Sequence, residues 1–192
     1  MIEEKDINCA RQIFSQYDYV SWLGQDKVDQ LISLSIEHGK AKAESCKAVR
    51  NGSEDLVMNI CEEEGITFDW EDTQSGDNTF VKFAQFEVKT KRITLNSHAI
   101  HTISDRNEVY PFEMVRDVLI AHELYHYLEF TKWGCLYKQH TFTRKLFGLI
   151  PVRYSLLPMS EIAANAFAKE LLDLTFNPYE LNSLYFSSLK HK

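Results

Sequence analysis

Two histidines and a glutamate in one apolar stretch have the spacing of a zinc site. The segment VLIAHELYHYLEF (118–130) contains His122, Glu123 and His126 in the order H-E-x-x-H. Residues four apart lie on one face of a helix, about 6 Å from each other, so both imidazoles can reach one ion through bonds of about 2 Å. Glu123 is rotated about 100° around such a helix, where it can act as general base on a water held by the ion.

The alternative interpretation makes His122 and His126 core histidines, each with its own hydrogen-bond partner. For a single histidine this alternative is the better one. Burying three polar groups on neighbouring turns, however, costs several kcal/mol unless all of them are satisfied. A metal ion satisfies them together, so the pattern favours a metal site.

A catalytic zinc takes three protein ligands and keeps a fourth position for water. Glu129 lies on the same helix face, but about 10 Å along the axis from His122, which is too far for both to share an ion. Glu129 can at best hold His126 from outside the ligand set, and an exposed or salt-bridged glutamate is the commoner alternative. A longer zinc peptidase pattern places a glycine and then a third histidine after the motif, but Glu129 and Lys132 occupy these two positions. The third ligand must therefore come from another element.

Glu161 is the best-placed acidic residue downstream. It opens the segment SEIAANAFAKELL (160–172), whose apolar residues fall on the opposite side of the predicted helix. Asn165 lies one turn further on, where its side-chain amide can orient a metal-bound histidine.

The elements that must position these residues follow from hydrophobic periodicity and from cap and turn residues. Helices are predicted at 4–20, 25–39, 53–65, 111–132, 160–172 and 177–190, and strands at 66–70, 79–88 and 92–96. The helix at 111–132 is apolar around most of its circumference, which predicts a central position. The strands predict a small, mostly antiparallel sheet, and 135–158 is expected to be irregular. The fold class is therefore α+β.

Five boundaries are predicted from single residues. Ser53 and Ser160 are expected to cap helices, and Gly65 and Gly134 to end them. Pro111 suits a first helical position, because its missing N–H is not needed there. A turn is expected at 89–91, between the last two strands.

Composition sets the outer limits. A chain of 192 residues with 44% hydrophobic and 26% charged residues is expected to form one domain (1–192), with an N-terminal helical part (1–52) and a core (53–192). A formal charge of −7 argues against nucleic-acid binding. The sequence has no signal-like start and no apolar run of membrane-spanning length, so we expect a cytoplasmic protein without a membrane partner. Four scattered cysteines are expected to be reduced thiols.

The paired segments AHELYHYLE and SEIAANAFAKELL resemble the ImmA/IrrE family of zinc metallo-endopeptidases. In that family the H-E-x-x-H helix is followed by a helix with a Glu, then Ala-Asn, Phe-Ala and a Leu-rich end. The order of elements before the motif is also similar, and the resemblance spans roughly 56–172. It implies a zincin-like domain with two active-site helices.

Carried onto matching positions, the resemblance makes His122, His126 and Glu161 the ligands of one Zn²⁺ per chain and Glu123 the catalytic base. It implies hydrolysis of a peptide bond in a substrate that lies along an exposed strand. By analogy with the family, this substrate would be a helix-turn-helix repressor. Two positions depart from the family pattern. Tyr125 replaces a common glycine and is expected to narrow the space near the metal, and Ala163 replaces a second acidic residue.

Two questions stay open at this level. A second donor should stabilise the tetrahedral oxyanion, and Tyr154, His140 and Arg153 are candidates. The rival function is a noncatalytic metal-bound module that regulates by binding a partner. Glu123 argues against this rival, because a structural site needs no base and normally fills the fourth position with a protein ligand.

Overall fold

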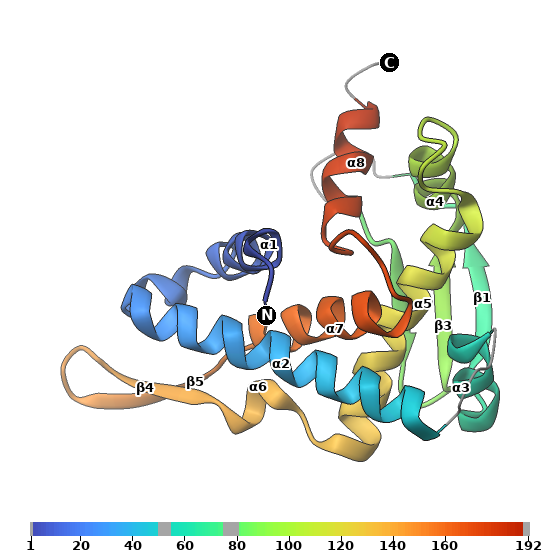
Figure 1. The fold of residues 1–192 in the computed structure, drawn as a ribbon. Helices are drawn as coiled ribbons and strands as arrows, with labels where there is room; N and C mark the ends of the chain where they lie inside the picture. Colours follow the sequence, from blue (N-terminus) through green and yellow to red (C-terminus); the bar gives the residue numbers. More distant parts are fainter. Residues whose placement is uncertain (1, 50–54, 75–80, 190–192) are drawn as a thin grey trace.

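A computed structural model of the chain describes residues 2–49, 55–74 and 81–189, and it shows an α+β fold (Figure 1). Its helices are α1 (Glu4–Ser15), η1 (Asp18–Trp22), α2 (Gln25–Val49), α3 (Leu56–Glu64), α4 (Ser97–Ser104), α5 (Phe112–Leu128), η2 (Glu129–Trp133), α6 (Leu136–Gln139), α7 (Pro158–Leu171) and α8 (Glu180–Leu189). Its strands are β1 (Thr67–Glu71), β2 (Ala84–Glu87), β3 (Arg92–Asn96), β4 (Thr141–Leu146) and β5 (Ile150–Ser155). No helix among these residues is both long and apolar enough to cross a membrane.

The elements are layered in the order α2, α7, α5 and the three-stranded sheet (Figure 1). Helix α5 is central, as the apolar residues around most of its circumference predicted. The buried ones include Val115, Val118, Leu119, Ile120, Leu124 and Leu128. Its last turn continues as the π-helix η2 and ends at Gly134, whose φ of +79° is a left-handed value suited to glycine. The predicted stop at Gly134 is therefore confirmed.

Helices α2 and α7 approach each other very closely at a glycine. A Cβ atom added to Gly39 would lie 2.2 Å from the carbonyl oxygen of Ala163 and 2.9 Å from the Cβ of Ala166. Small residues on α7 and a glycine on α2 thus allow the N-terminal helices to pack directly on the helix that carries Glu161.

The three-stranded sheet is mixed, so the expectation of a mostly antiparallel sheet was wrong for it. Strand β3 lies between β1, which is parallel to it, and β2, which is antiparallel. The β2–β3 hairpin closes at the predicted turn, where Lys91 has a φ of +50°. Side-chain pattern identifies a strand but does not fix the direction of its partner, so β1 could not be placed. The arrangement leaves β2 at an edge.

Several boundaries differ from those predicted. Helix α1 ends at Ser15 and η1 follows, α2 continues to Val49, and α4 was not predicted. Gly65, with a φ of +68°, closes α3 as expected, whereas Ser53 lies outside the described residues. Pro111 is the residue immediately before α5, and α7 begins at Pro158, so Ser160 lies inside its first turn and is not a cap.

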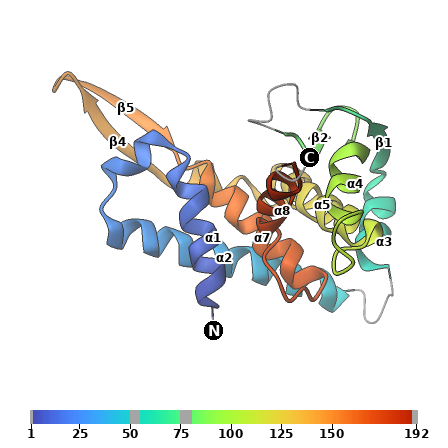
Figure 2. The same ribbon diagram turned by 90° about the horizontal axis from the view of Figure 1, so that it is seen from above.

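The segment expected to be irregular contains the antiparallel hairpin of β4 and β5, which extends away from the rest of the molecule (Figures 1 and 2). An aromatic cluster holds its base: Phe142 stacks on Tyr154, and both rings contact Tyr19 and Trp22. The partners of this hairpin come from the N-terminal helices, and 135–158 by itself gave no sign of them.

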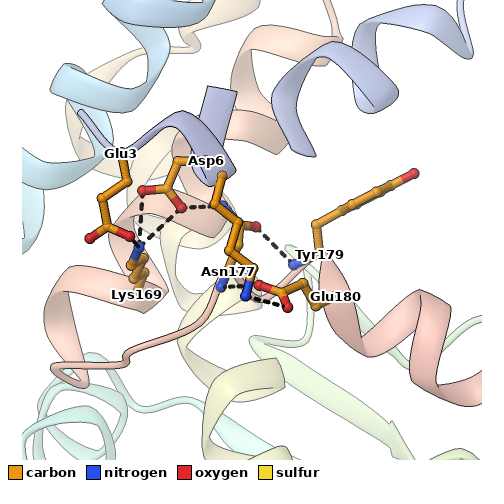
Figure 3. Close-up of polar contacts among 7 residues, drawn as sticks. Glu3, Asp6, Lys169, Asn177, Tyr179 and Glu180 are labelled. Atoms are coloured by element: carbon orange, nitrogen blue, oxygen red, sulfur yellow. Dashed lines mark hydrogen bonds and ion pairs between the residues drawn. The ribbon is translucent and has the colours of Figure 1, made fainter. Parts of the chain in front are cut away.

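A buried polar cluster attaches α1 to α7 and to the segment before α8 (Figure 3). The Lys169 ammonium donates to both carboxylate oxygens of Asp6, at 3.0 and 3.1 Å, and to Glu3 at 3.1 Å. The Asn177 side chain also donates to Asp6, at 2.8 Å. The cluster fixes α1 beside the helix that carries Glu161.

Candidate metal centre

The two histidines of α5 point their outer ring nitrogens at one another. His122 Nε2 and His126 Nε2 are 3.2 Å apart, and their rings are nearly perpendicular, at 71°. Both side chains are partly buried, so the face that carries them borders on accessible space. One helical turn thus brings two imidazole nitrogens to one point.

Glu161 completes this group from the first turn of α7. Its carboxylate oxygens lie 3.4 Å from His122 Nε2 and 3.5 Å from His126 Nε2. Among the described residues, these three form the one group whose ligand atoms, all within 4.8 Å of one another, could hold a metal ion. Ligands of a tetrahedral zinc with bonds of about 2.0–2.1 Å are separated by about 3.3 Å. The observed separations, in which each imidazole faces a different oxygen of Glu161, are close to this value, so the group could hold a zinc ion.

Each histidine has a polar partner at its other ring nitrogen. His122 Nδ1 lies 3.2 Å from Asn165 Oδ1, one turn beyond Glu161 on α7. His126 Nδ1 faces Glu129 Oε2 at 3.9 Å. A partner of this kind fixes the ring and leaves Nε2 free as a ligand.

Glu129 is buried, and so differs from the exposed or salt-bridged glutamate that we considered the commoner case. Its Oε1 accepts hydrogen bonds from Ser160 Oγ at 2.6 Å and from the Leu136 N–H at 2.8 Å. Burial acts to raise the pKa of this carboxyl, but the hydrogen bonds from His126, Ser160 and Leu136 outweigh burial and lower it. A negative charge is therefore fixed behind His126.

The ligand group is electrostatically suited to a cation. Burial raises the pKa of Glu161, but its hydrogen bonds with His122 and His126 and their charges take the pKa well below its usual value. Burial also lowers the pKa of His126, and the hydrogen bonds with Glu129 and Glu161 reverse this and raise it to about 10. Without a metal, the carboxylates of Glu129 and Glu161 therefore keep a proton on His126, at the place where a cation would bind.

Two cavities meet at this group. The larger, of about 780 Å³, is bounded by α1, α5, α8 and the start of β2, and the smaller, of about 360 Å³, by the rest of β2 and by η2. His122, Glu123, Glu161 and Ala84 line both cavities. Glu123 thus lies at the junction of the two cavities, beside the ligands and the edge strand.

Tyr17, which the sequence did not single out, lines the larger cavity together with His122, Glu123 and Glu161. Burial, followed by the negative charge of Glu161, raises the pKa of its phenol. The hydroxyl is therefore a protonated donor in the residue set that lines the larger cavity. Tyr17 follows α1 and is remote in sequence from every motif residue, so no spacing pattern pointed to it.

The three donors predicted from the sequence lie elsewhere. Tyr154 packs in the aromatic cluster of the hairpin, and Arg153 Nε donates to Thr141 Oγ1 at 2.9 Å. His140 is the residue after α6. None of the three lines either cavity. The reason is the unpredicted hairpin, which carries the residues after α6 away from the ligand group.

The two departures from the family pattern also lie outside the cavities. Tyr125 is fully buried among His38, Trp133 and Phe167, with its hydroxyl 3.5 Å from Glu129 Oε1. The expectation that it narrows the space near the metal was therefore wrong, because its side chain points into the core. Ala163 is buried beside α2.

Comparison of the chain with protein-family models, with curated proteins and with solved structures finds no match. The resemblance to the ImmA/IrrE family therefore rests on the two motifs and stays a prediction.

Proposed function

We propose that this protein is a zinc-dependent endopeptidase in which His122, His126 and Glu161 hold one Zn²⁺ and Glu123 is the catalytic base. The observation that carries the proposal is the convergence of two imidazole nitrogens and one carboxylate, 3.2 to 3.5 Å from one another, where two cavities meet. A zincin-like fold and membership of the ImmA/IrrE family are part of the same proposal.

The side chains around the ligands support hydrolysis of an amide. A bound zinc would supply Lewis acidity, which lowers the pKa of a water and polarises the scissile carbonyl. Glu123 takes the proton from the attacking water and passes it to the leaving nitrogen, so the base ends the reaction as it began. Asn165 and Glu129 hold the two imidazoles in place. The Tyr17 hydroxyl donates to the developing oxyanion.

The position of β2 supports an extended peptide as the substrate. This strand is the sheet edge beside Glu123, and its residues border both cavities. Main-chain hydrogen bonds to an edge strand would hold a peptide across the ligand group. The two cavities that meet at Glu123 would accommodate residues before and after the cut bond, which favours an endopeptidase over an enzyme that removes terminal residues.

The biological setting is proposed by analogy alone. Members of the family that the motifs resemble often cleave a helix-turn-helix repressor, so a repressor protein in the cytoplasm is our candidate substrate. The four cysteines, which form no disulfide, fit a reducing compartment.

The rival proposal of a noncatalytic metal-bound module is less well supported. Among the described residues, no fourth protein ligand joins the group of three. The carboxylate of Glu123 instead lines the cavity beside the ligands. A structural zinc normally has four protein ligands and no base at the metal.

Two measurements on purified protein test the proposal. Elemental analysis should find about one zinc per chain, and far less in Glu161→Ala. A peptide library analysed by mass spectrometry should then show products with wild type and none with the isosteric Glu123→Gln, which keeps its zinc. Equal cleavage by both proteins, or a wild type that takes up no zinc, would overturn the proposal.

A further inference from the structure

The region around the β4–β5 hairpin has a charge opposite to that of the rest of the chain. Residues 130–160 contain five basic residues, Lys132, Lys138, Arg144, Lys145 and Arg153, and no Asp or Glu. Since the whole chain has a formal charge of −7, this segment carries +5 and the remainder −12. One projecting element of an acidic protein is therefore cationic.

The end of the hairpin is apolar and bare. Phe147 is 85% exposed, Leu149 83% and Ile150 57%, and we call these three residues the apolar tip. Phe147 adopts a left-handed φ of +51°, which is uncommon for a bulky side chain and costs conformational energy. Exposed and strained apolar side chains at the end of a projection (Figures 1 and 2) are of no benefit to the fold itself.

Basic side chains surround the hairpin just behind this tip. Arg144 lies over the ring of Trp22 at 4.0 Å, on the face that packs against the aromatic cluster. Lys145 and Arg153, which are exposed, belong to the opposite face, because side chains alternate along each strand. These three residues form a basic collar. At about 3.3 Å per strand residue, counted from Phe147 or Leu149, Lys145 lies about 7 Å, Arg144 about 10 Å and Arg153 about 13 Å from the tip.

We propose that the hairpin docks on a lipid surface that contains anionic lipids, with the apolar tip in the bilayer interface and the basic collar among the head groups. The polar region of one leaflet is about 5–8 Å deep, and long basic side chains reach further, so the spacing of tip and collar fits it. The cytoplasmic leaflet is anionic and attracts such clusters.

Shape and charge favour a bilayer over a protein partner. A convex tip with side chains on all sides needs no complementary groove in order to enter a bilayer interface. The strongly acidic remainder of the chain would be repelled by an anionic surface, which restricts the approach to the hairpin. The aromatic cluster at the base holds the hairpin in its projecting position. This proposal is independent of the peptidase proposal, and it departs from the expectation, drawn from the lack of a membrane-spanning run, that the protein has no membrane partner.

Sedimentation with vesicles tests the inference on the full chain. Wild type should bind vesicles of equal parts phosphatidylglycerol and phosphatidylcholine at low salt, and should not bind pure phosphatidylcholine. Phe147→Ser with Leu149→Ser should weaken binding at least roughly tenfold, since each removes an inserted apolar side chain. Val109→Ser is the matched control, because Val109 is 70% exposed in another part of the fold, and it should bind like wild type.

Two further variants separate binding from folding. Phe147→Gly removes the ring and relieves the left-handed strain, so this protein should be no less stable than wild type and yet lose binding. Lys145→Glu should weaken binding by more than roughly tenfold, whereas Lys27→Glu, an equal change of charge on exposed α2 surface, should have little effect. No binding by wild type, or equal losses in the two charge variants, would overturn the proposal, and the first result would favour a protein partner.

Discussion

Ser160 donates a hydrogen bond of 2.6 Å to Glu129, and this bond connects the two helices of the candidate metal centre. Ser160 immediately precedes the ligand Glu161, and Glu129 lies three residues after the ligand His126. The same carboxylate faces His126 Nδ1. A single buried side chain therefore sets the distance between the helices and the orientation of one imidazole.

Glu129→Gln tests this role. The amide keeps the shape of the side chain but removes the negative charge behind His126, so the affinity for zinc should fall about 10–100-fold. The stoichiometry should stay at one zinc per chain, because no ligand is lost. Competition with a chromophoric chelator measures both quantities. Glu64→Gln is the matched control, since Glu64 accepts a hydrogen bond from Tyr127 of α5 and lines neither cavity. An equal loss of zinc affinity in this variant would contradict the role of Glu129.

Zinc uptake should release protons and should strengthen as the pH rises. In the metal-free protein the pKa of His126 is raised to about 10, so at neutral pH its imidazole is protonated and must lose this proton to become a ligand. The apparent affinity should rise up to about tenfold per pH unit between about pH 6 and pH 8. Calorimetry in buffers of different ionisation enthalpy should detect about one proton released per zinc.

The His126 imidazole also affects the stability of the metal-free protein. Its pKa in the folded state lies above the ordinary value of 6.5, so the stabilisation is fully present below about pH 6.5 and is lost as the pH rises towards about 10. Thermal unfolding of metal-free protein should show this decline. An affinity for zinc that does not change with pH, together with a flat stability profile, would argue that His126 is neutral without metal.

Tyr17→Phe should lower the rate of peptide cleavage without loss of zinc. The change removes one hydrogen-bond donor at the cavity and leaves the ring, so kcat should fall by about 10²–10³ while KM changes little. The test applies once a cleaved peptide is in hand. Tyr154→Phe removes the same atom from the hairpin and should cleave like wild type. If Tyr154→Phe lowered the rate and Tyr17→Phe did not, Tyr154 would be the oxyanion donor, as the sequence suggested.

What the sequence predicted of this site was local. His122 and His126 are one turn apart on a single helix, and Glu161 and Asn165 are one turn apart on another, so helical spacing alone placed each pair. The sequence also predicted the turn after β2 and the glycine ends of α3 and η2, because these depend on the conformation of one or two residues.

What escaped prediction depends on contacts between distant segments. Tyr17 reaches the cavity because Asp6 and Lys169 hold α1 beside α7, and neither residue marks such a contact by its spacing. The hairpin is stabilised by Tyr19 and Trp22, more than a hundred positions earlier in the chain. The parallel pairing of β1 with β3 likewise involves a choice of partner that no local pattern encodes.

Lys169→Met should destabilise the protein by about 3–5 kcal/mol, because the buried Asp6 carboxylate would lose its cationic partner. Chemical denaturation measures the free energy of unfolding. Lys47→Met is the matched control: Lys47 pairs at 2.6 Å with Asp173, whose side chain is 82% exposed, and such a pair contributes about 0–1 kcal/mol. The double change Lys169→Met with Asp6→Leu should recover much of the loss, since it removes both buried charges together. Similar losses in the Lys169 and Lys47 variants would mean that the buried cluster does not fix α1, and the position of Tyr17 at the cavity would then need another support.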